Sequence, residues 1–170
     1  MTMRDTLRET PQKAVYAALA DLRAGMLGVE GSGQHMQPMT HFVDEAAGEI
    51  WFITSASSDL VRAVGLGGQA HYCIITPDQT THACLMGPLE QVSSREKLDE
   101  IWSPAVAAWF KEGKDDPEIC LLRLTLNTAA VWASTSSAVV FAVEMARSAM
   151  SESHLPDVGD HRIVTFDAAA

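Results

Sequence analysis

Hydrophobic and polar residues alternate along most of the chain in short runs, a pattern typical of half-buried β-strands. In Glu49–Thr54, for example, Trp51 and Ile53 fall on one face and Phe52 and Thr54 on the other. Turn sequences rich in Gly, Pro and Asp separate the runs. The pattern predicts strands at residues 26–29, 34–43, 49–54, 70–76, 80–93, 118–126 and 129–134, and a last short strand at 162–166. Short strands at this spacing indicate a small barrel.

Helical periodicity interrupts the strands. Thr10 and Pro11 open the first helix as N-cap and N1 residues, and Gly25 stands where a glycine typically ends a helix. Ser57 or Ser58 caps a short second helix. Further helices are expected at 94–102, from 104 onward and at 137–150. We therefore expect one domain over residues 1–170, with an N-terminal helix in 1–25, a barrel with inserted helices in 26–134, and a C-terminal helix and tail in 135–170.

The balance of charged residues restricts the kinds of binding partner that we expect. Twelve basic and 22 acidic residues give a net charge of −10, which disfavours nucleic acid and anionic membranes because both reward basic patches. No run approaches the roughly 18 apolar residues that a membrane span needs. The first residues, Met1–Arg8, carry charges where a secretory signal has an apolar stretch. We expect a cytoplasmic protein that takes a small-molecule ligand.

The three cysteines are predicted to be buried thiols. Cys73, Cys84 and Cys120 lie in apolar runs, and no CxxC or Cys/His cluster has metal-ligand spacing, so no metal site is expected. Pairing of the two strands around the turn at 77–79 places Cys73 near Cys84. Two neighbouring reduced thiols are expected, and a regulatory disulfide is the alternative.

Two segments have the chemistry of a ligand site. In the strand at 34–43, alternation places Gln37, Met39 and His41 on one face, and Pro38 lacks the N–H that a paired strand needs. A locally unpaired strand is a common place for a ligand. The second segment is the helix start at Ser57 and Ser58, where free N–H groups and hydroxyls could seat a phosphate. The alternative for these serines is a simple helix cap.

Several motifs together resemble a known family. They are QPM at 37–39, WFIT at 51–54, IWSPAVAAWFKEGKDDPE at 101–118, LLRL at 121–124 and AAVWAS at 129–134. These motifs resemble the FMN-binding split barrels of the pyridoxamine-5′-phosphate oxidase superfamily, and within it the branch similar to general stress protein 26. The resemblance implies a mainly β protein with flanking helices (α+β), built on a six-stranded antiparallel split β-barrel. It also implies a homodimer with one FMN at each of two equivalent interface sites.

The resemblance also assigns roles to residues. Gln37, Pro38 and Met39 would run beside the isoalloxazine ring. Phe52, Ile53 and Thr54 would present backbone groups and a hydroxyl to the ring and ribityl chain. Ser57 and Ser58 would meet the phosphate, and Trp132 would approach the cofactor from the partner subunit. The full set of candidate cofactor-binding residues is Gln37, Pro38, Met39, Phe52, Ile53, Thr54, Ser57, Ser58, Leu60 and Trp132.

The chain departs from the family where charge matters. Gln37 stands in place of an arginine, and Asp59 and Leu60 occupy the positions of the cations that hold the phosphate. Losing two charge-assisted hydrogen bonds costs roughly 3–6 kcal/mol, or about two to four decades of affinity. The favourable interaction of the helix N-terminus with a phosphate contributes only about 0.3–2 kcal/mol. Arg62 is expected to point away from Leu60, so FMN binding should be weak unless Arg95, Lys97 or a partner's cation compensates.

Two hypotheses remain open from the sequence. The first is a flavin-dependent oxidoreductase or flavin carrier that uses the family fold with an altered phosphate site. The second is a split-barrel dimer that binds FMN weakly or not at all and serves as a stress-related binding protein for another ligand. We predict no catalytic acid, base or nucleophile, because hydride chemistry belongs to a bound flavin and the protein orients it.

Overall fold

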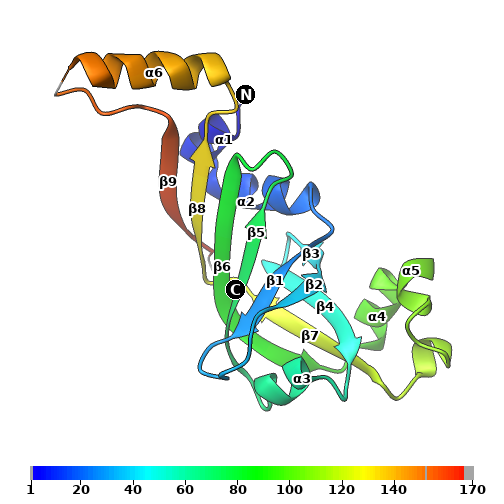
Figure 1. The fold of residues 1–170 in the computed structure, drawn as a ribbon. Coiled ribbons are helices and arrows are strands. Elements are labelled where there is room, and N and C mark those ends of the chain that lie inside the picture. The colour runs from blue at the N-terminus through cyan, green and yellow to red at the C-terminus, as the bar shows by residue number, and fades with distance from the viewer. Residues whose placement is uncertain (1, 152, 167–170) are drawn as a thin grey trace.

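The computed structural model describes residues 2–151 and 153–166, and it shows a mainly β molecule whose antiparallel sheet curls into a half-barrel (Figure 1). The predicted split barrel is confirmed, although the sheet has nine strands and not six. The strands are β1 Ala24–Val29, β2 Gln37–Thr40, β3 Phe42–Asp44, β4 Glu49–Ser55, β5 Gly68–Ile75, β6 Thr81–Val92, β7 Ile119–Thr125, β8 Thr128–Ser134 and β9 Gly159–Thr165. The helices are α1 Met3–Glu9, α2 Pro11–Ala20, α3 Asp59–Val64, α4 Arg95–Ile101, α5 Pro104–Ala107 and α6 Ala138–Met150, with a 3-10 turn at Gly113–Asp115. The end of the predicted tail, residues 167–170, lies outside the described residues.

The strand order explains the split. Neighbours follow the path β2-β1-β5-β6-β7-β4-β3, and β8 pairs with β6 and β9. The two ends of the path, β2 and β3, are separated along the chain by His41 alone, so the predicted strand at 34–43 is in fact two strands. The sheet therefore curls until its ends meet without pairing.

The long strand β6 serves two parts of the sheet. Thr81–Met86 pair with β8, and Leu89–Val92 pair with β7. Gly87 lies between these regions, where a Cβ atom would stand 1.8 Å from the carbonyl oxygen of Thr125. Glycine is required there because the backbones approach too closely for a side chain.

The inward faces of the strands and α2 form the main core. Val15 and Leu19 of α2 are fully buried with Leu27, Phe52 and Tyr72 of the strands. The predicted faces of β4 are confirmed, since Phe52 belongs to this core and Trp51 to a second, smaller one. That second core joins Trp51 and Leu121 of the sheet to Leu98 and Ile101 of α4.

The N-terminal region differs from its prediction. A helix was expected up to Gly25, but α2 ends at Ala20 and Gly25 lies in β1 opposite Met39. A Cβ atom on Gly25 would stand 2.7 Å from the Cys73 carbonyl oxygen and 2.8 Å from the Tyr72 ring. A glycine is therefore needed here because the neighbouring strand lies so close, and not because a helix ends. Helix α1, which Thr2 caps at its start, was not predicted.

The C-terminal segment extends from the barrel. β9 begins at Gly159, earlier than predicted, and the predicted helix α6 stands out beyond the ends of β8 and β9 (Figure 1). Arg4 and Arg8 of α1 form ion pairs with Asp157 and Asp160, which fix β9 to the N-terminal helices.

Candidate functional site

The split exposes two strand edges. β3 pairs with β4 only over Glu49–Trp51, whereas β7 pairs with the whole of β4. Within the described residues, Phe52–Ser55 thus have a strand partner on one side, and β2 has β1 alone. The adjacent segments of β2 and β4 can offer backbone N–H and C=O groups to a ligand, because an open edge presents an unpaired row of both.

Nine of the ten predicted residues belong to β2, to β4 and to the segment Ser57–Leu60 that leads into α3. Pro38 and Ser57 are exposed, and Gln37, Ile53, Thr54 and Ser58 are partly exposed. Met39, Phe52 and Leu60 are 9%, 0% and 2% exposed and belong to the main core. Their side chains fill the barrel and are therefore not available to a ligand at the split.

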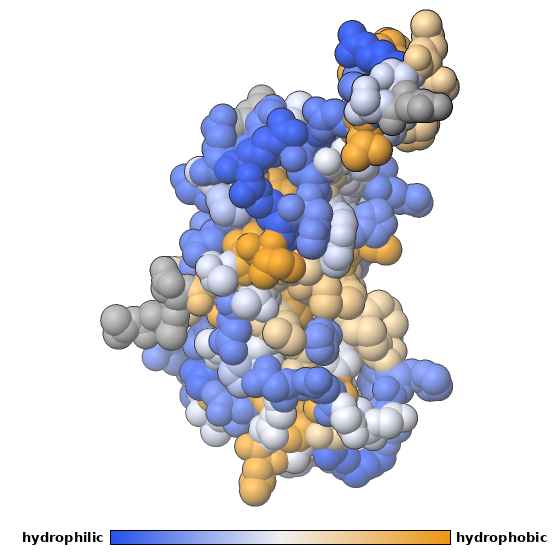
Figure 2. All heavy atoms as spheres, turned by 90° about the vertical axis from the view of Figure 1, so that its left-hand side faces the viewer, coloured by the Kyte–Doolittle hydropathy of each residue, from blue (hydrophilic) through white to orange (hydrophobic). Residues whose placement is uncertain are grey.

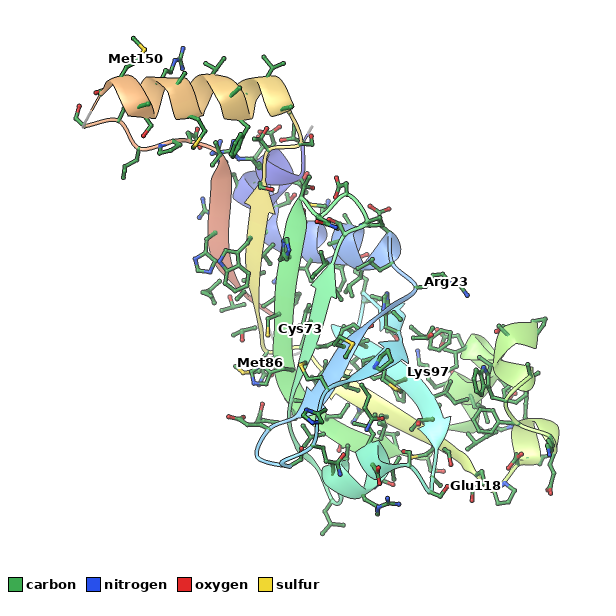
Figure 3. The ribbon with its side chains drawn as sticks, viewed as in Figure 1. Arg23, Cys73, Met86, Lys97, Glu118 and Met150 are labelled. Atoms are coloured by element: carbon green, nitrogen blue, oxygen red, sulfur yellow. The ribbon has the colours of Figure 1, made fainter. Side chains whose placement is uncertain are left out.

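The hydroxyls at the predicted phosphate end already have partners. Ser58 accepts a hydrogen bond from the Val61 amide at 3.2 Å and caps α3, which is the simple role that the sequence left open. Ser55 and Ser57 donate to Glu118 Oε2 at 2.7 and 2.8 Å. These bonds lower the pKa of Glu118, so the carboxylate stays charged at the end of β4 (Figure 3).

Arg62, a cation that the sequence predicted to be out of reach, lies at this end. Arg62 points away from the buried Leu60, as expected, but its side chain leans toward the start of α3. Its Nη1 donates to the Ser57 carbonyl at 2.7 Å, and its guanidinium forms an ion pair with Asp59. The spacing of three residues between Asp59 and Arg62 was the available signal.

The other candidate cations are engaged. Lys97 bonds Asp44 at 2.9 Å and Glu100 at 2.8 Å, with its side chain 13% exposed. Arg95 bonds Asp115 at 2.6 Å. Arg95 and Lys114 line a cleft of about 590 Å³ that also includes Gln91 and Cys120. The phosphate end itself therefore holds Asp59, Arg62 and Glu118, one positive charge against two negative.

Trp132 lies apart from the other nine residues. Its ring stacks on His161 at a centroid distance of 4.8 Å and is 46% exposed. β8 is four strands from β2 along the sheet, roughly 19 Å at 4.8 Å per strand. One chain does not bring Trp132 to the split.

The outer face of the sheet is unusual in its lack of charge. One complete row of paired residues crosses six strands as Pro38, Met26, Cys73, Cys84, Ala130 and Ile163. The adjacent rows are Ile75, His82, Trp132 and His161, and Gly28, His71, Met86, Thr128 and Thr165. These rows, called the outer face below, contain no Asp, Glu, Lys or Arg. Figure 2 views the molecule from the β9 side, where hydrophobic atoms gather over its middle.

The predicted proximity of Cys73 and Cys84 is confirmed, because they are direct cross-strand partners. Cys84 Sγ lies 3.4 Å from His71 Nδ1. Burial, together with the neighbouring Cys84, raises the pKa of Cys73 to about 11, which leaves it a thiol at neutral pH. Among the described residues, no three His, Cys, Asp or Glu side chains are grouped as a metal site.

None of the helices in the described part of the chain is both long and apolar enough to span a bilayer.

Comparisons with known proteins place the chain among relatives. Residues 10–157 match the family profile described as "Pyridoxamine 5'-phosphate oxidase like". The crystal structure of a protein from Jannaschia sp. CCS1, called general stress protein 26, is 34% identical with a TM-score of 0.72, and the match covers 89% of this chain and 95% of that one. The general stress FMN/FAD binding protein from Xanthomonas citri is 33% identical with a TM-score of 0.68, covering 76% of this chain and 92% of its own. A search of curated protein sequences gives no match.

Proposed function

The chain belongs to the pyridoxamine 5′-phosphate oxidase-like family, and from this premise we propose that it binds a flavin at the split between β2 and β4, in a flavin-dependent redox or flavin-carrying role. The observation that carries the proposal is the pair of open strand edges, Gln37–Thr40 and Phe52–Ser55. The name of the Xanthomonas citri relative, an FMN/FAD binding protein, supports it.

The residues at the split suit the ring of a flavin. Backbone groups of Ile53, the Thr54 hydroxyl and the amide of Gln37 can hydrogen-bond the carbonyl and N–H groups of an isoalloxazine. The bound flavin would supply electron or hydride transfer, and the chain would bind and orient it. The described residues at the split contribute no acid or base pair of their own.

The phosphate end suits FMN poorly. A phosphate dianion placed near Ser57 would meet Glu118 and Asp59, and Arg62 is already neutralised by Asp59. We propose that the chain therefore binds FMN little more tightly than riboflavin, which has the same ring system without the phosphate. The same observation favours a second candidate function, a split barrel that has lost FMN and binds another, uncharged ligand.

We also propose a homodimer with ligand sites at its interface. The outer face supports this assembly, because an uncharged surface with exposed Met26, Ile75, Trp132 and Ile163 is unusual on a chain of net charge −10. A partner's Trp132 could then approach a split that its own chain does not bring near it.

Fluorescence titration of the purified chain with FMN and with riboflavin tests the proposal. We expect both to bind, with dissociation constants within about threefold of each other. The double variant Asp59→Asn, Glu118→Gln removes two negative charges. It should tighten FMN binding by about tenfold or more, equivalent to about 1.4 kcal/mol, and leave the affinity for riboflavin unchanged. The matched control is Glu9→Gln with Asp21→Asn, which removes two negative charges at exposed positions of the N-terminal helical region, away from Glu118. Absence of quenching by both flavins at hundreds of micromolar would reject the flavin site and leave the second candidate.

A further inference from the structure

Helix α6 exposes apolar side chains on most of its surface. Its sequence is AVVFAVEMARSAM, and Val139, Phe141 and Met150 are 73%, 51% and 88% exposed. Val140, Val143 and Met145 are also exposed. The helix stands away from the barrel in Figure 3, where Met150 marks its end.

The one acidic residue of α6 turns back toward its own chain. Glu144 is 9% exposed and accepts hydrogen bonds from Arg147 at 2.9 Å, His154 at 2.9 Å and the Asp157 amide at 3.2 Å. This cluster fastens α6 to the segment that returns to β9. The Glu144 carboxylate is thus satisfied locally, and apart from Arg147 and Ser148 the rest of the helix is apolar.

Such a helix requires a covering surface. Isolated helices of about 12–15 residues are marginal in water and depend on burial of an apolar face. α6 has 13 residues, and Glu144 is its one buried residue in the described structure. A membrane is a poor candidate, since a surface-bound helix is typically rich in Lys and Arg, and α6 has Arg147 alone on a chain of net charge −10.

We propose that α6 of one protomer packs on the outer face of a second copy of the chain. Helix and face are continuous, because β8 and β9 both border the face with Trp132 and His161 and carry α6 at their ends. Both surfaces are predominantly apolar, with Arg147 the one exposed charge among their residues, and a two-fold dimer joins them reciprocally, helix to face and face to helix. This inference rests on the proposed homodimer and specifies how it is held.

The apolar area that a stable dimer must bury indicates that both the outer face and α6 contribute to the interface. Fully burying an aliphatic side chain removes roughly 100 Å² of apolar surface, so a half-exposed one supplies roughly 50 Å². The four large exposed residues of the outer face, Met26, Ile75, Trp132 and Ile163, give roughly 200 Å², and the six on α6 add roughly 300 Å². A stable interface buries about 800 Å² per partner, of which somewhat more than half is apolar. The face alone falls short, whereas face and helix together reach that apolar share.

Sedimentation velocity on the full chain, with three matched substitutions of exposed apolar residues, tests the arrangement. Phe141→Glu changes α6, Ile163→Glu changes the outer face, and Trp109→Glu changes an exposed tryptophan near α5, away from both. We expect the wild type and Trp109→Glu to be dimers. Phe141→Glu and Ile163→Glu should each weaken the dimer by at least 30-fold, with unchanged far-ultraviolet circular dichroism of the barrel.

Hydrogen exchange separates this inference from the proposed dimer. Amides of 138–150 should be protected in the dimer and lose protection in Ile163→Glu, although that substitution lies on another element. A dimer that survives Phe141→Glu but not Ile163→Glu would overturn the role of α6 and leave the proposed dimer intact. A monomeric wild type would overturn both. Flotation with vesicles of equal phosphatidylcholine and phosphatidylglycerol should leave the protein unbound, and binding that Phe141→Glu abolishes would overturn the inference.

Discussion

His41 joins β2 to β3 and is held on both sides of its ring. Nδ1 lies 2.7 Å from the Tyr72 hydroxyl, and Nε2 lies 2.9 Å from the Leu19 carbonyl oxygen, to which it donates. Burial lowers the pKa of His41 below its ordinary value of 6.5. The folded chain therefore binds fewer protons here than the unfolded chain, so the stability from neutral His41 is fully present above pH 6.5 and is lost as the pH falls through the folded pKa.

This linkage predicts a measurable slope. The free energy of unfolding of the wild type, from urea titrations at pH 7.5, 6.5 and 5.5, should fall more steeply with acid than that of His41→Gln, which cannot titrate. His35→Gln, at an exposed position, should keep the wild-type slope. Parallel slopes for the wild type and His41→Gln would show that this histidine is not the titrating group.

Gly87 allows a second test at the residue scale. Gly87→Ala places a methyl group 1.8 Å from the Thr125 carbonyl oxygen, so β6 or β7 must shift. We expect a loss of about 2–4 kcal/mol in unfolding free energy, since overpacking at backbone costs roughly 1–3 kcal/mol and sometimes more. Gly68→Ala is the matched control, because its Cβ would contact only the Val29 side chain at 3.4 Å. Equal losses in the two variants would contradict the steric account.

Residue-level prediction succeeded where a local rule decides the outcome. The two faces of β4 follow from alternation, and the cap at Ser58 follows from its place before an apolar helix. Gly25 was misassigned because the close approach of Tyr72 and Cys73 comes from another strand and leaves no local signal. Glu118 was missed for the same reason, since its hydrogen bonds to Ser55 and Ser57 join residues about 60 positions apart.

Helix α4 is attached to the sheet by one lysine as well as by its apolar face. Lys97 bonds Asp44 at the end of β3, and its ammonium lies 5.4 Å from the centre of the Trp51 ring. This contact contributes most to the lowered pKa of Asp44. Lys97→Ala should cost about 1–3 kcal/mol, because it leaves Asp44 without its partly buried partner.

Urea unfolding at pH 7 measures that loss, and Lys111→Ala, at an exposed position, is the control. The direction in which pH changes this stability follows from the pKa of Asp44. Its folded pKa is lowered, so the contribution is present above the unfolded value of 3.8 and is lost as pH falls through the folded pKa. The difference between wild type and Lys97→Ala should therefore shrink in acid. A difference that stays constant down to pH 2 would assign the loss to packing on Trp51.

The elements were predictable in proportion to their local signals. The hairpin of β5 and β6 and the strands β7 and β8 lie within about two residues of their predicted ranges, because turn residues bound them sharply. The strand at 34–43 was predicted as one piece because no glycine marks its break. The break at His41 arises from hydrogen bonds to α2 and β5, which alternation cannot reveal.

At the scale of the whole molecule, composition restricts the partners but does not locate them. A net charge of −10 disfavours nucleic acid, yet it says nothing of where charge is missing. The uncharged outer face emerges only when the register sets Cys73 beside Cys84 and Met26 beside Cys73. Its rows draw on six strands spread between β1 and β9, so sequence order conceals the surface that we propose as the dimer interface.

A coupled dimer makes thermal stability depend on protein concentration. If unfolding and dissociation occur together, each tenfold increase in concentration stabilises the folded dimer by about 1.4 kcal/mol, and the midpoint should rise by about 2 °C. Differential scanning calorimetry from 0.1 to 10 mg/ml measures this shift. Phe141→Glu should remove the concentration dependence, whereas Trp109→Glu should preserve it. A midpoint independent of concentration in the wild type would mean that the barrel is stable without a partner, and the exposed apolar residues of α6 and the outer face would then need a different explanation.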